Sequence, residues 1–175
     1  MVDPCTLTSV TRSVQYSAPP SATYIGPMLA IRRARVADVD RLAPLFDAYR
    51  QFYQRPTDLE LARRFLGERL QRDESIILLA ETPAGAVCGF TQLYPLYSSL
   101  AGRRSWYLSD LFVDPAARRA GVGRRLLEAA HDLARETHAS SVELDTAHTN
   151  QASQALYESL GYRLDTEFRH YVLKL

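Results

Sequence analysis

Hydrophobic and polar positions change their spacing along the chain, and these changes separate strands from helices. Residues 29–35 (LAIRRAR) alternate apolar and charged side chains, which predicts a strand with one face toward solvent. Apolar residues then recur every three or four positions over residues 39–53 and again over residues 59–70, which predicts two amphipathic helices. Thr57 or Asp58 is suited to cap the second of them.

Three strands and a long helix are expected next. Residues 76–80 form a short apolar run, and residues 86–94 return as its antiparallel partner after a turn. Residues 94–104 have the composition of a loop, and residues 106–113 form the following strand. Apolar positions on one face of residues 122–137 then predict a helix.

The last part of the chain predicts a strand, a helix and a closing hairpin. The strand covers residues 141–146 and should run parallel to the strand before the long helix. Residues 152–160 form a helix that ends at Gly161, and residues 162–164 and 168–173 form the hairpin. This order of elements predicts an α+β fold: a central mixed sheet of about six to seven strands with helices on both faces.

The first 27 residues differ from the rest in composition. Residues 1–27 are rich in Ser, Thr and Pro, carry two charged side chains and show no sustained periodicity, which favours a flexible leader. Residues 28–175 are expected to form a single domain. Met28 directly precedes the first strand, so we hypothesise that it is the natural start of the protein.

Overall composition is that of an ordinary globular protein: 46% of residues are hydrophobic, 23% are charged, and the formal net charge is +1. This balance argues against a nucleic-acid or membrane binder that acts through its total charge. Cys5 and Cys88 are too few for a disulfide framework, and no Cys or His spacing is typical of a metal site. We therefore expect a reduced, cytoplasmic protein that holds no metal.

One loop concentrates positive charge and glycine. Four arginines and two glycines lie within eight residues: Arg118, Arg119, Gly121, Gly123, Arg124 and Arg125. A strand followed by such a loop and then a helix presents backbone N–H groups and a helix N-terminus to an anion. A dinucleotide-binding fingerprint is excluded because Leu126 stands at the position of the third glycine, and no Gly-Lys-Ser/Thr sequence of a P-loop follows. The alternative is a glycine-rich turn with solvated arginines.

Two separate motifs resemble the GNAT superfamily of N-acetyltransferases, and the order of elements resembles it over residues 29–175. The first motif joins residues 111–115 (LFVDP) to an R-x-x-G-x-G run at residues 118–123, and the second is the helix pattern of residues 150–162 (NQASQALYESLGY). Within the family, residues 107–113 (YLSDLFV) resemble most the subset that acetylates polyamines and diamines.

The resemblance implies that acetyl-CoA is the co-substrate. Its pyrophosphate would lie in the loop of residues 118–123, and its pantetheine arm would pair with the backbone of the preceding strand. The residues expected to contact it are Leu111, Phe112, Val113, Arg118, Arg119, Ala120, Gly121, Val122, Gly123, Arg124, Asn150, Ser153 and Tyr157.

The resemblance also implies a general acid. It places Tyr157 beside the acetyl sulfur, where a phenol with a pKa of about 10 can protonate the CoA thiolate while staying neutral at pH 7. The alternative is a core tyrosine that packs against Leu156 and Leu160. Asn150 could cap the last helix or bind the pantetheine.

The general base is less clear, because the chain departs from the family pattern there. Ser109 stands where the polyamine subset has a glutamate, and serine cannot accept the amine proton unassisted. Asp110 is adjacent, but strand alternation would place it on the opposite face from Ser109. Glu81, Tyr94 and Tyr97 are other candidates, and a chain of water molecules would need no dedicated residue.

The acceptor is expected to be a small-molecule primary amine, such as a polyamine or an amino-acid-like compound. In similar proteins the first two helices and the loop after the third strand form the acceptor wall, to which this chain would contribute aromatic residues: Tyr49, Phe52, Tyr53, Tyr94 and Tyr97. Aromatic faces attract cationic amines, although the same residues could belong to the core. A homodimer is common in similar proteins and is expected here.

Three alternatives stay open at this point. The acceptor could be a protein lysine or N-terminus instead of a small molecule. Because the glutamate is missing at Ser109, a non-catalytic acyl-CoA-binding domain is also possible. A nucleic-acid module would need a continuous basic face from the arginine pairs at 103–104, 118–119 and 124–125, which the near-neutral net charge disfavours.

Overall fold

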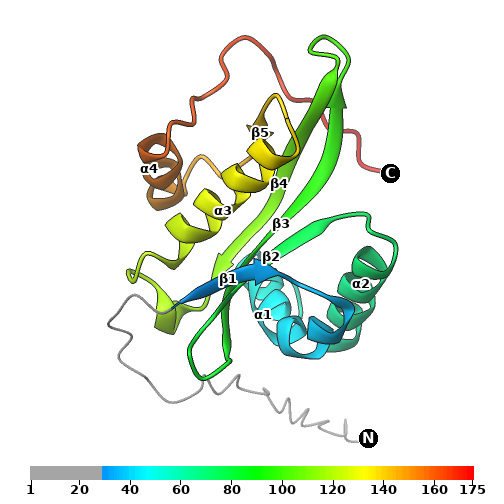
Figure 1. Cartoon of the computed structure of the whole chain (residues 1–175), viewed down its shortest axis with the longest axis vertical. Coiled ribbons are helices and arrows are strands. Elements are labelled where there is room, and N and C mark those ends of the chain that lie inside the picture. Colours follow the sequence, from blue (N-terminus) through cyan, green and yellow to red (C-terminus); the bar gives the residue numbers. More distant parts are fainter. Residues whose placement is uncertain (1–28) are drawn as a thin grey trace, which may run out of the picture.

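A computed structural model describes residues 29–175, and its centre is a five-stranded sheet with the strand order β1-β2-β3-β4-β5 (Figure 1). The strands are β1 (Ala30–Arg33), β2 (Ile76–Glu81), β3 (Val87–Ser98), β4 (Arg103–Val113) and β5 (Val142–Glu143). Strands β1 to β4 pair antiparallel, and β5 pairs parallel to β4, as predicted. The predictions for the leader, for Met28 and for Cys5 lie outside the described residues.

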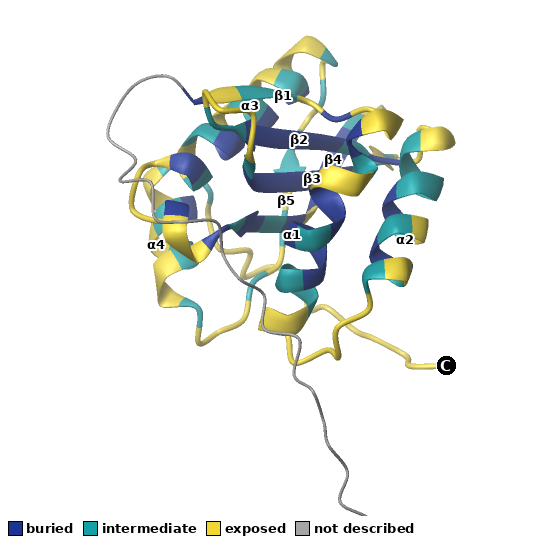
Figure 2. Cartoon of the chain, turned by 90° about the horizontal axis from the view of Figure 1, so that it is seen from below, coloured by how far each residue is buried: buried dark blue, intermediate teal, exposed yellow. Residues whose placement is uncertain are grey.

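Helices cover both faces of this sheet, which confirms the predicted α+β architecture (Figure 1). They are α1 (Val39–Phe52), α2 (Leu59–Gln71), α3 (Val122–Glu136) and α4 (Gln151–Ser159), with single 3-10 turns at Val36–Asp38 and Pro115–Ala117. Helices α1 and α2 pack on one face, and α3 and α4 on the other, so that the sheet is buried between them (Figure 2). Asp58 caps α2 as predicted, because its carboxylate accepts the N–H of Leu61 at 2.9 Å.

Gly89 on β3 brings α3 close to the sheet. A Cβ atom at this position would stand 3.0 Å from Cγ1 of Val122 and 3.2 Å from Cδ1 of Leu126. Both contacts are tighter than ordinary van der Waals packing, so even alanine would require Val122 and Leu126 to shift by a few tenths of an ångström. The glycine therefore sets where the N-terminus of α3 lies.

The stretch predicted as a loop at residues 94–104 is instead a β-hairpin, so that prediction is wrong. Strand β3 continues to Ser98 and pairs with β4 as far as Arg103. Pro95 lies within β3 where this strand no longer has a β2 partner, because the pairing with β2 ends at Leu93. A proline is tolerated on such a free strand edge, where its missing N–H costs no ladder hydrogen bond.

The predicted C-terminal hairpin is also wrong, and with it the count of six to seven strands, since residues 162–175 contain no strand. Strand β5 has two residues instead of the six expected, so its free edge offers few backbone groups for pairing. The apolar side chains of this segment are mostly exposed: Leu164, Phe168, Tyr171, Val172, Leu173 and Leu175. Alternation of apolar and polar residues does not by itself produce a strand when no neighbouring strand is available to pair with it.

Residues 29–175 show neither a membrane-spanning helix nor a cluster of metal ligands. None of their helices combines the length and the apolar character needed to cross a bilayer. No three His, Cys, Asp or Glu side chains of this range come together as metal ligands. Cys88 is buried in β3, where burial raises the pKa of its thiol to about 11.

Candidate active site

A cleft opens where β4 and β5 separate. Their pairing covers only Trp106 with Val142 and Tyr107 with Glu143, so the rest of β4 has a free edge on this side. The N–H of Asp114 donates to the carbonyl of Cys88 on β3 at 2.9 Å. Because N–H groups alternate between the two edges of a strand, those of the odd-numbered residues 111 and 113 point toward the cleft.

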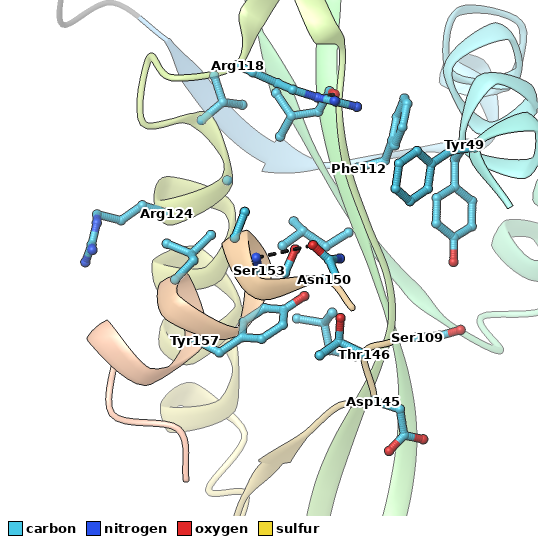
Figure 3. Close-up of a pocket in the computed structure, with 18 of the residues that line it drawn as sticks. Tyr49, Ser109, Phe112, Arg118, Arg124, Asp145, Thr146, Asn150, Ser153 and Tyr157 are labelled. Carbon is cyan, nitrogen blue, oxygen red and sulfur yellow. Dashed lines mark hydrogen bonds between the residues drawn. The ribbon is translucent and has the colours of Figure 1, made fainter. Parts of the chain in front are cut away.

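The cleft has a volume of about 440 Å³ and runs from the start of α3, across β4, to α4 and the end of α1 (Figure 3). It brings together most of the predicted site residues: Tyr49, Phe52, Tyr53, Ser109, Leu111, Phe112, Val113, Arg118, Arg119, Gly121, Val122, Gly123, Arg124, Asn150, Ser153 and Tyr157. The other lining residues are Leu108, Asp145, Thr146, Ala152 and Leu156.

The loop before α3 has the backbone of an anion site. Arg119 and Gly121 both adopt left-handed backbone conformations, with φ of 63° and 76°. Gly121 is the N-cap of α3, whose first N–H groups have no partner within the helix. A Cβ at Gly123 would stand 3.5 Å from Leu156 on α4 and 3.8 Å from Val113 on β4, so the missing side chain keeps the passage between them open.

Two arginine side chains beside this loop, Arg118 and Arg124, are held in place by hydrogen bonds. Nε of Arg118 donates to the carbonyl of Val113 at 3.1 Å, and its guanidinium lies 5.6 Å from the ring centroid of Phe112. Arg124 donates to the hydroxyl of Ser159 on α4 at 2.8 Å. Ala120, which was also predicted to contact the cofactor, is exposed and does not line the cleft.

Tyr157 lies on α4 with its phenol in the cleft (Figure 3). Asn150 caps this helix by accepting the N–H of Ser153 at 3.4 Å, which confirms the capping alternative. The Tyr157 ring packs edge-on against Tyr162 at 5.7 Å, and the Tyr162 hydroxyl lies 2.9 Å from Nε2 of His131. Burial raises the pKa of Tyr157 above its ordinary 10.0 despite a hydrogen bond with Ser153, so the phenol is protonated at neutral pH.

A bulge in β4 changes the predicted placement of Ser109 and Asp110. Gln92 of β3 pairs with Asp110 and Leu93 pairs with Leu108, so Ser109 is the extra residue between them. The expectation that Ser109 and Asp110 lie on opposite faces is wrong, because the bulge interrupts alternation and a hydrogen bond joins their side chains.

Asp110 lies beneath the cleft surface and does not line it. Burial raises the pKa of its carboxyl, although hydrogen bonds with Tyr49 and Ser109 act in the opposite direction. The pKa of Tyr49 is raised in turn, first by burial and then by the Asp110 charge. The carboxyl is therefore less ready to lose its proton than an exposed aspartate.

Three other candidates lie away from the cleft. Tyr94 is on the β3–β4 hairpin, where its hydroxyl accepts a hydrogen bond from Gln92 at 3.0 Å, and burial raises its pKa to about 12. Tyr97 is 72% exposed further along the same hairpin. Both are outside the lining because residues 94–98 extend as a strand instead of folding over the site. Glu81 forms ion pairs with Arg32 at 2.7 Å and with Arg41 at 2.6 Å.

Asp145 is the ionisable cleft residue that sequence reasoning missed. It lies two residues after the end of β5, and one of its oxygens accepts a hydrogen bond from the Tyr107 hydroxyl at 2.8 Å. This hydrogen bond and burial raise the pKa of Tyr107 to about 12, burial being the larger cause. The sequence held a usable signal, because ligands bind beyond the carboxyl ends of parallel strands.

Comparison with known proteins agrees with this geometry. The sequence model of the Acetyltransferase (GNAT) family matches residues 42–162. The chain is 48% identical over 145 residues to the uncharacterized N-acetyltransferase YhfO of Bacillus subtilis, covering 83% of this chain and 97% of that protein. It is 31% identical over 143 residues to a probable acetyltransferase of Haemophilus influenzae, covering 82% and 96%.

The fold comparison gives the same result. A crystal structure of a probable acetyltransferase superposes with a TM-score of 0.80 at 44% identity, covering 83% of this chain and 97% of the other. The resemblance stated from the motifs at residues 111–123 and 150–162 is therefore confirmed. This protein is an N-acetyltransferase and belongs to the GNAT acetyltransferase family.

Proposed function

We propose that this protein transfers an acetyl group from acetyl-CoA directly to a primary amine of a small molecule while both are bound. GNAT acetyltransferases generally use acetyl-CoA. The observation that carries the proposal is the separation of β4 from β5, which leaves unpaired strand N–H groups facing a cleft between the α3 N-terminus and Tyr157. Each part of that cleft has a distinct task.

The residues around the α3 N-terminus fit the phosphate end of acetyl-CoA. Gly121 turns the backbone into its left-handed region, and the open position at Gly123 leaves room for a ligand chain between β4 and α4. Arg118, Arg119 and Arg124 add positive charge at this end. Acetyl-CoA bound here would supply an activated thioester to the free edge of β4.

The free edge of β4 would orient and polarise the reacting carbonyl. A backbone N–H near Val113 points away from β3, and no strand of the described chain takes it up. A fixed N–H donor aimed at a developing negative charge stabilises a transition state without reorganisation. Tyr157, across the cleft on α4, would donate the proton that the leaving thiolate needs.

Asp145 is the best placed residue to accept the amine proton. Its carboxylate is exposed and accepts a hydrogen bond from the Tyr107 hydroxyl, and it lines the same cleft as Ser109 and Thr146. Ser109 has no acidic group of its own, and Asp110 is buried with a raised pKa. In this proposal Ser109 therefore hydrogen-bonds the amine, and Asp110 orients Ser109 and Tyr49.

Asp145→Asn should lower kcat/KM for an amine about ten-fold at pH 7, because an amide cannot accept the proton but bulk water reaches this exposed site. The loss should shrink as the pH rises, since more of the amine is then already deprotonated. Rates measured from pH 6 to 10 test this. A loss that is the same at every pH would mean that Asp145 does not act as the base.

The overall activity is tested by detecting free thiol when purified protein, acetyl-CoA and a panel of primary amines are mixed. We expect release of CoA above hydrolysis with at least one small amine, together with the acetylated amine by mass spectrometry. Binding of acetyl-CoA without transfer to any amine would favour the non-catalytic alternative. Transfer only to a lysine peptide or to a peptide N-terminus would contradict a small-molecule acceptor.

The homodimer and the cytoplasmic location stay predictions. The homodimer has some support in the apolar side chains exposed between residues 164 and 175, which a second copy would cover. The measured mass of the purified protein in solution decides it.

A further inference from the structure

The acceptor side of the cleft is a continuous aromatic wall. The rings of Tyr49 and Tyr53 lie 5.2 Å apart, as do those of Phe52 and Tyr53. Phe112 closes the wall at 5.9 Å from Tyr49 and 6.4 Å from Phe52. Phe52 is 53% exposed and Tyr53 48% exposed, so their surfaces are open to a ligand.

Negative charge in the same cleft is confined to one place. Asp145 is the single carboxylate among its lining residues, whereas Arg118, Arg119 and Arg124 all line it. Asp110 lies behind the wall and is 8% exposed. The guanidinium of Arg118 lies over Phe112, so a cation already occupies part of the aromatic surface.

Building on the proposed function, we infer that the acceptor is a primary amine with one positive charge on an uncharged, apolar body. The amine lies near Ser109 and Asp145, and the apolar body lies against the aromatic wall. A body of alkyl or aryl groups gains from burial against these rings. A second ammonium group would lose hydration there and find no carboxylate to pair with.

An acceptor of this class differs from the polyamines that the resemblance of the β4 motif implies. Ser109 places an uncharged hydroxyl at the reacting end of the cleft, so Asp145 is the one carboxylate among the residues that line it. The aromatic wall offers no second negative charge, because its members are phenols and phenyl rings and the pKa of Tyr49 is raised.

The test compares n-hexylamine with cadaverine. The two amines have equal length, but cadaverine carries a second ammonium where n-hexylamine has its terminal methyl. We expect kcat/KM for n-hexylamine to exceed that for cadaverine at least about ten-fold at pH 7. Equal or better use of cadaverine would overturn the inference but leave the acetyltransferase proposal intact. Transfer only to amines that carry a carboxylate would overturn it as well.

A variant pair locates the effect on the wall. Phe52→Glu adds a carboxylate at a half-exposed position and should shift the ratio of the two kcat/KM values at least about ten-fold toward cadaverine. Phe52→Leu keeps the surface apolar and should retain the preference for n-hexylamine. An unchanged ratio in Phe52→Glu would overturn the placement of the apolar body. If acetyl-CoA binds but no amine is acetylated, the proposed function fails and the acceptor class fails with it.

Discussion

Tyr157→Phe should lower kcat about a hundred-fold or more, because the phenol is expected to donate a proton in the chemical step. The affinity for acetyl-CoA should change by less than about two-fold, since a phenyl ring keeps the packing against Tyr162. Steady-state rates and a direct acetyl-CoA titration of the same preparation give both quantities. An unchanged kcat would place the proton donor elsewhere.

The pH dependence adds a second readout for the same residue. Tyr157 can donate only while protonated, and burial raises its pKa above the ordinary 10.0. The kcat of the native protein should therefore hold through neutral pH and fall only above about pH 10. Tyr162→Phe is a matched control, because it removes the hydroxyl beside His131 but keeps the ring against Tyr157, and its kcat should change little.

Gly121→Val should weaken acetyl-CoA binding at least about ten-fold. At a φ of 76° a non-glycine residue is strained, and a β-branched side chain more so, so the loop must move its N–H groups away from their present directions. A Cβ at Gly121 meets no atom within 4 Å, which means that the effect comes from the backbone and not from a clash. The dissociation constant of acetyl-CoA, measured by calorimetry, tests this.

The control for that variant is Gly85→Val. Gly85 has a φ of 81°, also meets nothing within 4 Å, and lies in the β2–β3 turn outside the cleft. Gly85→Val should therefore lower the melting temperature to a similar degree and leave acetyl-CoA affinity unchanged. A normal affinity in Gly121→Val would contradict the assignment of the loop.

Local sequence signals predicted the helix starts and caps around the loop of residues 118–123 well. The start of α3 after the Gly121 turn and the Asn150 cap of α4 both depend on residues within a few positions of each other. Such short-range rules, together with two motifs at a compatible spacing, also identified the GNAT family. These rules predict the backbone conformation at the starts of α3 and α4, and both helix starts border the cleft.

The acceptor side depended on long-range packing, and there the predictions were less accurate. Strand alternation could not reveal the β4 bulge, because the extra residue at Ser109 is defined only by its pairing with β3. Tyr94 and Tyr97 were assigned to the acceptor wall because residues 94–104 were predicted to form a loop, whereas pairing with β4 carries them along a hairpin. Asp145 was missed because it becomes part of the cleft only where β5 separates from β4.

The central claim is direct transfer from acetyl-CoA to an amine within one cleft. A single-turnover experiment tests it. The protein is mixed with less than one equivalent of acetyl-CoA, and excess n-hexylamine is added. Acetyl-hexylamine, CoA and the intact protein are then monitored by mass spectrometry at successive times. We predict that acetyl-hexylamine appears as CoA is released and that the protein mass never changes. An acetylated protein that forms before the acetylated amine, or CoA release without acetylated amine, would contradict this account.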